Sequence, residues 1–546
     1  YSSAASNPSV SGSLHEPLAI VGMACRLPGA EDLDAFWELL ASGGYAVERM
    51  PEAKLDRELY FDSEKGVRGK TYSDVGGFVQ QRDWDWSLLP IDPSEASDWD
   101  ECHLNMCEVV AKACQHAGFN PRNLPIRNTG VFVGHSGGST TGGELAFRLL
   151  APDYVELLEE LECKGEIPNL AALKQELLSS LQRERPQRIH GKPLSESSFA
   201  SGIISHAFGL TGPYMSVDAA CASSLVALAL GADALHAGQI DMAIVGGASY
   251  NKADSLILFS KAQSCSASAS RPFDARADGL ISSEGYVGVL IKTLQRALLD
   301  GDRIQAVIRG IGISSDGRGR SLWAPRKEGQ HEAIQRAYSD DVRPDSIQLV
   351  EAHATSTQVG DATEMEALST FFGQQLPSGV RIPVGSVKSN IGHTLETAGL
   401  AGLIKSVLAM QNQTVPPSVN VEQLSPSIPW HEIPLYVARE CQPWPFPEKG
   451  QPRRAAVNAF GIGGLNVHVV VEQYDGTRSG APPLAAKISS ADSPSAKIQT
   501  QPEPIAIIGR GLVVPGANSV EAYRKLLKMP VSRLRLPPKD RMRGAN

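Results

Sequence analysis

Residues 212–225 read GPYMSVDAACASSL and predict a turn between a strand and a long helix, with Cys221 at the turn. The segment before the turn is of β type, and residues 225–237 are rich in alanine and leucine. A helix N-terminus offers free amide donors and a partial positive charge, which favour a thiolate and can hold a developing oxyanion. Small alanine neighbours leave room for a long thioester. We therefore predict an ionised nucleophile at Cys221, although a cysteine before a helix, taken alone, is usually structural.

Two histidines follow predicted strands further along the chain. His353 lies in residues 350–357, VEAHATST, and His393 lies in residues 384–393, VGSVKSNIGH. In both segments a strand leads into a turn of small and polar residues, and strand ends are where α/β sites assemble. Two N–H donors can stabilise the enolate oxygen that forms when a malonyl thioester loses CO2. A lone histidine at either place would more often be structural, so the hypothesis depends on the pair.

A lysine and a glycine-rich loop complete the set of candidate site segments. Lys388 could fix the local electrostatics or pair with a carboxylate such as Glu396 or Glu364, although an isolated lysine is usually a surface residue. Residues 458–468, NAFGIGGLNVH, precede a predicted strand, so no helix follows that could receive a pyrophosphate. The glycines instead let backbone amides approach a substrate closely, as an oxyanion site requires.

The composition is that of a globular protein. Of the 546 residues, 42% are hydrophobic and 20% are charged, which allows a large core. The net charge of −9 and the lack of a long basic block argue against nucleic acid as a partner. Without a signal-peptide pattern or a long apolar run, we expect a cytoplasmic protein with no membrane partner. The eight cysteines show neither CxxC pairs nor zinc-ligand spacing, so we predict no disulfides, no metal and no cofactor bound by this domain.

Short β-branched runs, amphipathic stretches and glycine turns alternate over residues 17–473 and predict one α/β domain. Residues 1–16 are expected to be disordered. A charged, leucine-rich stretch near residues 151–190 is helical in pattern and is interpreted as a peripheral insertion. Residues 474–503 are rich in serine, proline and alanine, which is typical of a linker.

The segment after the linker repeats the opening of the domain. Residues 503–527, EPIAIIGRGLVVPGANSVEAYRKLL, match residues 16–40, EPLAIVGMACRLPGAEDLDAFWELL, at an offset of 487. In the first copy, residues 18–23 predict a strand and residues 32–40 a helix. This offset is far longer than a solenoid period, so residues 504–546 are interpreted as the start of a second, truncated domain of the same kind.

The opening segment, the segments around Cys221, His353 and His393, and the glycine-rich loop resemble, in this order, the β-ketoacyl synthase family. The resemblance covers residues 17–473 and is closest to ketosynthase domains of type I polyketide synthases and of polyunsaturated fatty acid synthase-like multidomain enzymes. It implies a thiolase fold, which is an α/β five-layer αβαβα sandwich of two similar halves. It also implies a homodimer, or a pseudo-dimer with the second ketosynthase-like domain.

The resemblance implies a decarboxylative Claisen condensation that extends a polyketide or fatty acyl chain. Cys221 would take an acyl group from an acyl carrier protein, whose phosphopantetheine carries the substrates. Malonyl carrier protein would then lose CO2 beside His353 and His393, and the resulting carbanion would attack the acyl group on Cys221. No other cofactor is implied for this domain.

Further residues receive roles from the same resemblance. The backbone amides of Cys221 and Phe460 would form the oxyanion hole, and Phe460 would gate the pocket. Lys388 matches the essential lysine of the family, with Glu396 as its acidic neighbour. Supporting positions are Thr355, Thr357, Gly463 and Asn466.

Two departures from the family pattern bear on pocket shape and donor preference. Residues 353–357 read HATST where family members of this type usually read HGTGT, and Leu465 replaces the threonine of the usual FGFGGTN.

Three alternatives share the fold. A degradative thiolase would carry a second catalytic cysteine in its last glycine-rich loop, where this chain has none. A non-catalytic, chain-length-factor-like partner of another ketosynthase would be expected to lose the cysteine or a histidine. A loading decarboxylase would typically have glutamine in place of Cys221.

Overall fold

The chain divides into two compact units, one of residues 1–142 and 188–479 and one of residues 143–187 and 480–546. Glu16, the last residue of the segment predicted to be disordered, accepts a hydrogen bond through its carboxylate from the backbone N–H of Gln295 at 2.7 Å. The disorder predicted for residues 1–15, most of the 151–190 insertion and most of the linker fall outside the described residues. The computed structural model describes residues 16–96, 99–137, 197–251, 253–444, 451–476 and 504–528, with Ser532 and isolated positions between 154 and 179.

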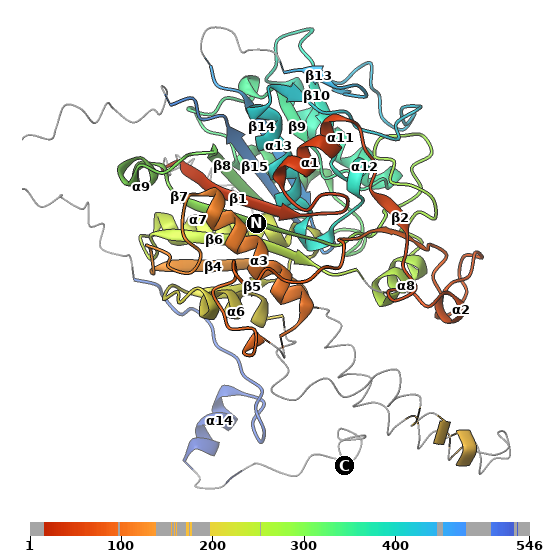
Figure 1. Cartoon of the computed structure of the whole chain (residues 1–546), viewed down its shortest axis with the longest axis vertical. Helices are drawn as coiled ribbons and strands as arrows, with labels where there is room; N and C mark the ends of the chain where they lie inside the picture. Colours follow the sequence, from red (N-terminus) through yellow and green to blue (C-terminus); the bar gives the residue numbers. More distant parts are fainter. Residues whose placement is uncertain are drawn as a thin grey trace, which may run out of the picture. The chain divides into compact units, whose positions relative to one another are not determined.

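The larger unit is organised around one mixed sheet of eleven strands (Figure 1). Its order is β12-β10-β9-β14-β15-β8-β1-β7-β6-β4-β5. The first half comprises β1 (Leu18–Arg26), β4 (Thr129–Gly134), β5 (Tyr214–Val217), β6 (Met242–Ser249) and β7 (Gly285–Thr293). The second half comprises β8 (Ala306–Ser315), β9 (Leu349–Glu351), β10 (Ile382–Gly385), β14 (Arg454–Phe460) and β15 (Leu465–Glu472), with β12 (Leu435–Val437) at its edge.

The two halves repeat one pairing pattern, which confirms the predicted pair of similar halves. In the first half β5, β4 and β6 are parallel, and β7 and β1 continue antiparallel. In the second half β10, β9 and β14 are parallel, and β15 and β8 continue antiparallel. The halves meet where β1 pairs with β8. Strands β5 and β10 therefore hold equivalent positions.

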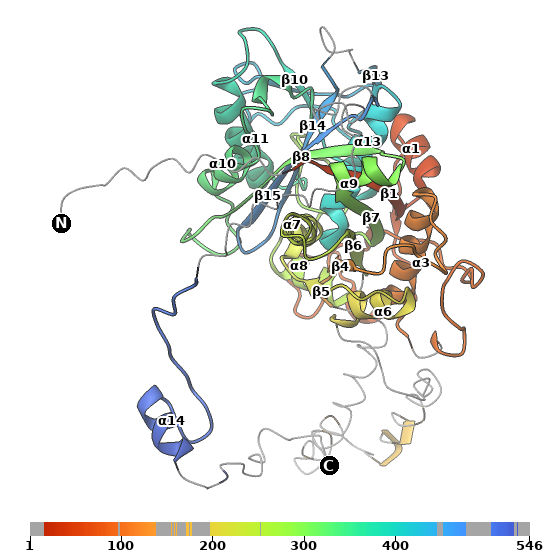
Figure 2. The same cartoon turned by 90° about the vertical axis from the view of Figure 1, so that its left-hand side faces the viewer.

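Helices cover both faces of the sheet and fill the layer between its halves (Figure 2). Helices α3 and α6 pack on the first half, α10 and α11 pack on the second, and α7 and α13 lie between them. Thirteen residues of α13 are buried, as expected of a helix enclosed on all sides. These helices are α3 (Glu101–His116), α6 (Phe199–Ala207), α7 (Ser223–His236), α10 (Lys327–Arg336), α11 (Gln358–Gly373) and α13 (Ala398–Gln411).

Shorter elements complete the described part of the larger unit. The helices are α1 (Leu33–Ala41), α2 (Arg57–Tyr60), α8 (Ala253–Lys261), α9 (Leu294–Asp300) and α12 (Lys388–Ile391). The 3-10 turns are η2 (Ala220–Ala222), η3 (Pro344–Ser346) and η4 (Leu395–Thr397). The short strands are β2 (Val47–Arg49), β3 (Val75–Gly77), β11 (Thr414–Val415) and β13 (Gln442–Pro443).

The local predictions for the opening segment are confirmed. All nine residues of β1 are buried, as expected for an apolar strand covered on both faces. Helix α1 begins after Asp32, whose side chain accepts a hydrogen bond from the backbone N–H of Ala35 at 2.9 Å.

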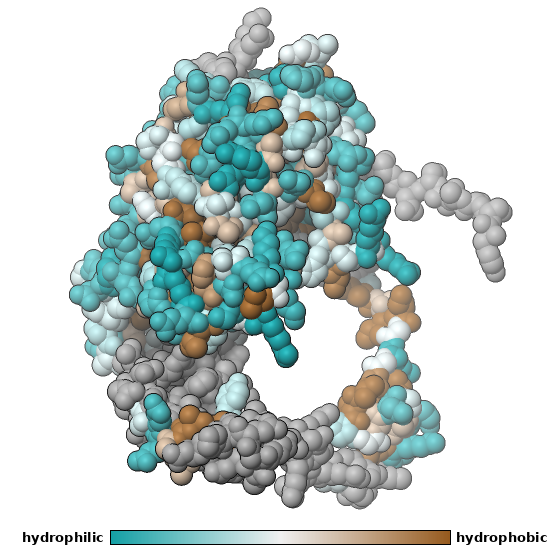
Figure 3. Space-filling view, turned by 90° about the vertical axis from the view of Figure 1, so that its right-hand side faces the viewer, coloured by the Kyte–Doolittle hydropathy of each residue, from teal (hydrophilic) through white to brown (hydrophobic). Residues whose placement is uncertain are grey.

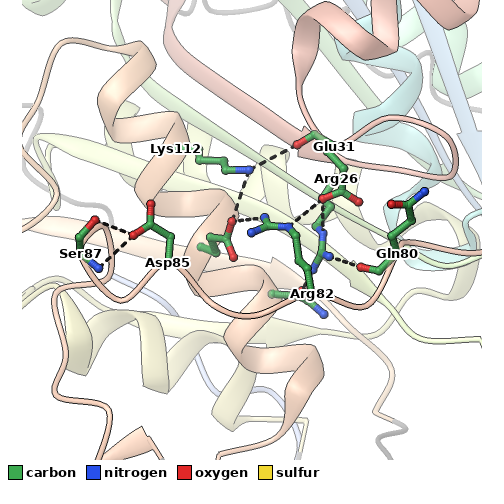
Figure 4. A network of polar contacts seen from close by, with 9 residues as sticks. Arg26, Glu31, Gln80, Arg82, Asp85, Ser87 and Lys112 are labelled. Atoms are coloured by element: carbon green, nitrogen blue, oxygen red, sulfur yellow. Dashed lines mark hydrogen bonds and ion pairs between the residues drawn. The ribbon is translucent and has the colours of Figure 1, made fainter.

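A charged network joins the end of β1 to α3 (Figure 4). Arg26 is only 2% exposed, and its guanidinium contacts Glu31 at 2.7 Å and also bonds Asn105 and the carbonyl of Gln80. Arg82 reaches the same Glu31 at 3.1 Å. The buried charge is thus fully paired, which a charge in a dry interior requires.

The smaller unit contains the repeated segment, with local geometry that matches the first copy. Val514 and Ala517 exchange two backbone hydrogen bonds, as Leu27 and Ala30 do in the first copy. Helix α14 (Val520–Leu527) follows Ser519, whose hydroxyl caps the N–H of Ala522 at 3.2 Å. The isoleucines 505, 507 and 508 are 96%, 89% and 99% exposed, whereas their equivalents in β1 are buried.

Figure 3 shows apolar side chains scattered among hydrophilic ones on the displayed face of the larger unit. Within the described ranges, no helix is long and apolar enough to cross a bilayer.

Candidate active site

Cys221 lies at a sharp turn between β5 and α7, as predicted from the sequence. Ala220 adopts a φ of +50°, in the left-handed region that non-glycine residues rarely occupy. The hydroxyl of Ser223 stabilises this turn, because it accepts from the N–H of Ala219 at 2.8 Å and donates to the carbonyl of Ala220 at 2.6 Å. Cys221, held by this strained turn, lines a cavity.

Both predicted histidines lie beside this sulfur. The Nε2 atom of His393 is 3.0 Å from the Sγ atom of Cys221. The ring of His353 lies 5.5 Å from that of His393, and one ligand atom from each of the three residues lies within 4.8 Å of the others. His393 follows β10 and Cys221 follows β5, so equivalent strands of the two halves supply the closest pair. The structure therefore brings together the three residues that the sequence singled out.

The resting ionisation differs from the prediction. Burial, reinforced by the charge of Glu396, raises the pKa of Cys221 to about 12, although Lys388 and backbone N–H groups act in the opposite direction. Burial also holds the pKa values of His353 and His393 well below their usual range. The predicted thiolate at rest is therefore wrong: the helix start does not outweigh desolvation in this dry site, and a neutral thiol faces two neutral imidazoles.

The same three residues could, by distance alone, share a soft metal ion such as Zn²⁺. A sulfur held by a metal would not be free to carry an acyl group, so this arrangement suits acyl transfer only without the metal.

Lys388 is 2% exposed and lies at the start of α12. Burial lowers the pKa of its ammonium group, and the carboxylates of Glu351 and Glu364 oppose this effect most strongly. Glu364, one of the two carboxylates named from the sequence, thus acts on Lys388 through its charge, after Glu351. Glu396, the other carboxylate named from the sequence, instead accepts a hydrogen bond from Ser136, and its charge raises the pKa of Cys221.

Glu364 fixes the backbone that carries His353. Its Oε1 atom accepts from the N–H of His353 at 2.8 Å, and its Oε2 atom accepts from the N–H of Ala354 at 2.7 Å. It also accepts from the side chain of Asn458 at 2.7 Å. Lys388 and these donors lower its pKa against the stronger effect of burial.

The glycine-rich loop closes the opposite side of the site. Gly461 passes so close to the cysteine turn that a Cβ atom would lie 2.3 Å from the carbonyl oxygen of Ala219. Gly463 adopts a φ of +106° and donates its N–H to the carbonyl of Leu322 at 2.9 Å. Asn466 donates to Asp316 at 2.7 Å, which joins the loop to the segment after β8.

The backbone amide of Ile462 in this loop acts on the sulfur, because it lowers the pKa of Cys221 against the stronger effect of burial. Phe460, which the sequence suggested for this place, instead packs its ring 5.7 Å from that of His353 and lines the cavity. The oxyanion amide at Phe460 stays a prediction, and Ile462, at the second phenylalanine position of the family pattern FGFGGTN, is a second loop residue near the sulfur.

Cys221, His353 and His393 line one cavity of about 400 Å³ together with Phe460 and Asn466, whereas Lys388, Glu396 and Gly463 do not line it. Thr355 and Thr357 both line it, with their hydroxyl oxygens 3.1 Å apart. Its rim includes the exposed apolar side chains of Leu322 and Trp323, in a segment after β8 that sequence reasoning missed because it carries no nucleophile, histidine or glycine motif. Asp316 and Ser136 were missed as well, since polar residues between strands give no pattern of their own.

The charges around the sulfur predict how its reactivity changes. Glu396→Gln should speed alkylation of Cys221 by iodoacetamide at pH 8, because removing a nearby negative charge lowers the pKa of the thiol. Lys388→Met should slow it for the opposite reason. Each pKa unit changes the thiolate fraction, and hence the rate, roughly tenfold. Peptide mass spectrometry would measure both rates, and equal rates in the two variants would contradict this electrostatic account.

Comparisons with known proteins agree with this site. The sequence matches the N-terminal domain of beta-ketoacyl synthase over residues 15–297, its C-terminal domain over 305–422, and the ketoacyl-synthetase C-terminal extension over 425–502. A pikromycin polyketide synthase component of Streptomyces venezuelae is 36% identical over 85% of the chain and 28% of its own length. A mycocerosic acid synthase-like polyketide synthase of Mycolicibacterium smegmatis is 35% identical over 93% of the chain and 22% of its own length. The chain thus spans about a quarter of these relatives.

Solved structures give the same result. The ketosynthase from module 6 of the bacillaene synthase of Bacillus subtilis has a TM-score of 0.69 and 31% identity, covering 84% of this chain and 72% of that one. The PfaC keto synthase-chain length factor has a TM-score of 0.80 and 27% identity, covering 97% of this chain and 54% of that one.

Proposed function

Because the chain belongs to the β-ketoacyl synthase family and carries a ketosynthase condensing domain, we propose that Cys221 accepts an acyl group and joins it to a malonyl unit. The observation that carries this proposal is the 3.0 Å approach of His393 to the Cys221 sulfur, with His353 in the same cavity. The further proposal is that both substrates arrive on the phosphopantetheine of an acyl carrier protein, in the assembly of a polyketide or fatty acyl chain.

In the first half-reaction, the thiol proton of Cys221 moves to the neutral His393 as the sulfur attacks the acyl thioester. The carrier thiolate leaves and takes up that proton. The N–H groups of Cys221 and Ile462 support the negative oxygen of the tetrahedral intermediate, as an oxyanion hole does. A neutral imidazole is needed for this step, and burial keeps His393 neutral by lowering its pKa.

In the second half-reaction, the malonyl thioester loses CO2 and its electron pair forms an enolate. The N–H of His353 and the N–H of His393, which has then changed to the tautomer protonated at Nε2, stabilise the enolate oxygen. The enolate carbon attacks the acyl carbonyl on Cys221, and the sulfur leaves and is protonated again. Lys388 and Glu364 maintain the electrostatics and the His353 turn during this step.

An adduct experiment tests this function. The chain is incubated with a panel of acyl carrier proteins, each loaded with a different acyl group, and intact-protein mass spectrometry reads the mass gained. We expect one acyl group per chain from at least one donor, and CO2 release after malonyl carrier protein is added. No adduct from any donor would favour the alternative, a non-catalytic partner of another ketosynthase.

We also propose that residues 504–546 begin a second ketosynthase-like domain after the linker. The matching turn and cap geometry at Val514, Ala517 and Ser519 supports this proposal. The exposed isoleucines of residues 505–508 support it as well, because the equivalent residues of β1 are buried between neighbouring strands.

The proposed dimer would form along β5, which lies at the edge of the sheet. Tyr214 and Met215 of this strand are 55% and 40% exposed among the described residues, and exposed apolar side chains on an edge strand favour pairing with another chain. In a homodimer, Met215→Cys should form a disulfide-linked dimer under oxidation, seen on a non-reducing gel. The exposed Leu299→Cys serves as the control and should stay monomeric on that gel. A monomer in both variants would contradict a homodimer along β5 and leave the pseudo-dimer with the second domain.

A further inference from the structure

Three side chains behind the active site form a hydrogen-bonded chain that ends at Glu364. The hydroxyl of Tyr338 lies 3.1 Å from Nε2 of His468, and Nδ1 of His468 lies 2.5 Å from Oδ1 of Asn458. Asn458 donates from Nδ2 to Glu364 at 2.7 Å. Glu364 in turn holds the backbone N–H of His353 at 2.8 Å.

This chain has one direction of donation. A carboxylate only accepts, so Asn458 turns its amide nitrogen to Glu364 and its oxygen to His468. His468 must then donate from Nδ1 and accept at Nε2 from the hydroxyl of Tyr338. Burial lowers the pKa of His468 to about 3, so the ring is neutral and carries the single N–H that this order requires.

We propose that Asn458, His468 and Tyr338 are positioning residues that hold Glu364, and through it the turn carrying His353, in the orientation that decarboxylation needs. None of the three lines the active-site cavity, so they act through Glu364, which does line it. The inference rests on the proposed role of His353 in decarboxylation.

The packing of these hydrogen-bonded side chains supports a positioning role. Asn458 lies on β14 and His468 on β15, directly opposite each other in the strand pairing. The ring of Tyr338 packs 4.9 Å from that of Phe371, on α11, the helix that also carries Glu364. The chain therefore links two strands of the second half to the helix behind the His353 turn.

The groups around Glu364 show how loss of the hydrogen bonds from Tyr338 to Asn458 would change its pKa. Burial raises the pKa of Glu364, and Asn458 is the strongest of the donors and charges that lower it, ahead of the Ala354 and His353 amides and Lys388. Asp361, on the same helix, faces it as a second carboxyl group. A weaker Asn458 donor would raise the pKa of Glu364, and a protonated Glu364 would hold the His353 turn less firmly.

Two substitutions of His468 separate positioning from packing. Leucine fills the space of the ring but cannot donate, whereas asparagine is smaller and can place an N–H near the position of Nδ1. We expect His468→Leu to lower kcat for malonyl decarboxylation by about 10- to 100-fold with little change in KM. We expect His468→Asn to recover most of that rate, and the acid limb of the rate profile to move to higher pH in His468→Leu only. Acylation of Cys221 should stay within about twofold in both variants.

Controls separate the possible failures. Tyr436→Phe removes a partly buried hydroxyl that accepts from Gln442 at 2.9 Å and has no bond to Tyr338, His468, Asn458 or Glu364, so it should leave both half-reactions unchanged. Equal rates for His468→Leu and His468→Asn, or a leucine variant faster than the asparagine one, would show a packing role and overturn the inference. If His353→Ala itself decarboxylates at the wild-type rate, the proposed role of His353 fails instead, and the inference fails with it.

Discussion

Replacement of Cys221 by alanine should abolish acyl transfer from a carrier protein to this chain, so that intact-protein mass spectrometry finds no acyl adduct. The expectation follows from the position of the sulfur, which is the only nucleophile at the strained turn facing His393 among the described residues. The cavity stays intact in this variant, because the substitution removes a single sulfur atom from a site lined by more than twenty residues.

The alanine variant should keep its fold, since the turn depends on Ser223 and Asp218 rather than on the sulfur. A thermal midpoint close to that of the wild type would confirm this. Cys441→Ala is the matched control, because Cys441 is an exposed thiol that could take up acyl groups without catalysis. An adduct that persists in Cys221→Ala and disappears in Cys441→Ala would show that Cys441, and not Cys221, carries the acyl group.

Much of this site could be predicted from the sequence because its parts carry local signals. The local sequence alone predicts that Cys221 lies between a strand and an alanine-rich helix. It likewise predicts that the two histidines follow strands, so all three residues are expected at strand ends. The repeat of residues 16–40 at 503–527 predicted an opening strand and helix in the smaller unit. The helix is present as α14, whereas residues 504–513 form no strand, because a strand needs neighbouring strands to pair with and the smaller unit has none among its described residues.

The errors came from properties that depend on the folded environment. The ionisation of Cys221 is set by burial and by Glu396, and neither can be judged from the residues beside the cysteine. The influence of the Ile462 amide on the sulfur depends on how the glycine-rich loop is folded, so the sequence did not single out this residue. The hydrogen-bonded chain from Tyr338 to Glu364 joins residues more than 90 positions apart in the sequence for two of its links, so no local pattern announces it.

Replacement of His353 by alanine should suppress malonyl decarboxylation by about 10²- to 10⁴-fold while acylation of Cys221 continues. The imidazole of His353 lies beside His393 but makes no hydrogen bond to the sulfur in the described structure, so the first half-reaction does not need it. Loss of its N–H would leave the enolate oxygen with one donor in a dry cavity, where an unpaired negative oxygen is costly.

His393→Ala should behave differently, because His393 contacts the sulfur at 3.0 Å and serves both half-reactions. We expect it to slow acylation as well as decarboxylation. Release of labelled CO2 from malonyl carrier protein and the rate of adduct formation measure the two steps separately. His353→Asn, which keeps an N–H donor, should retain more decarboxylation than His353→Ala; an undiminished CO2 release in His353→Ala would remove this residue from the reaction.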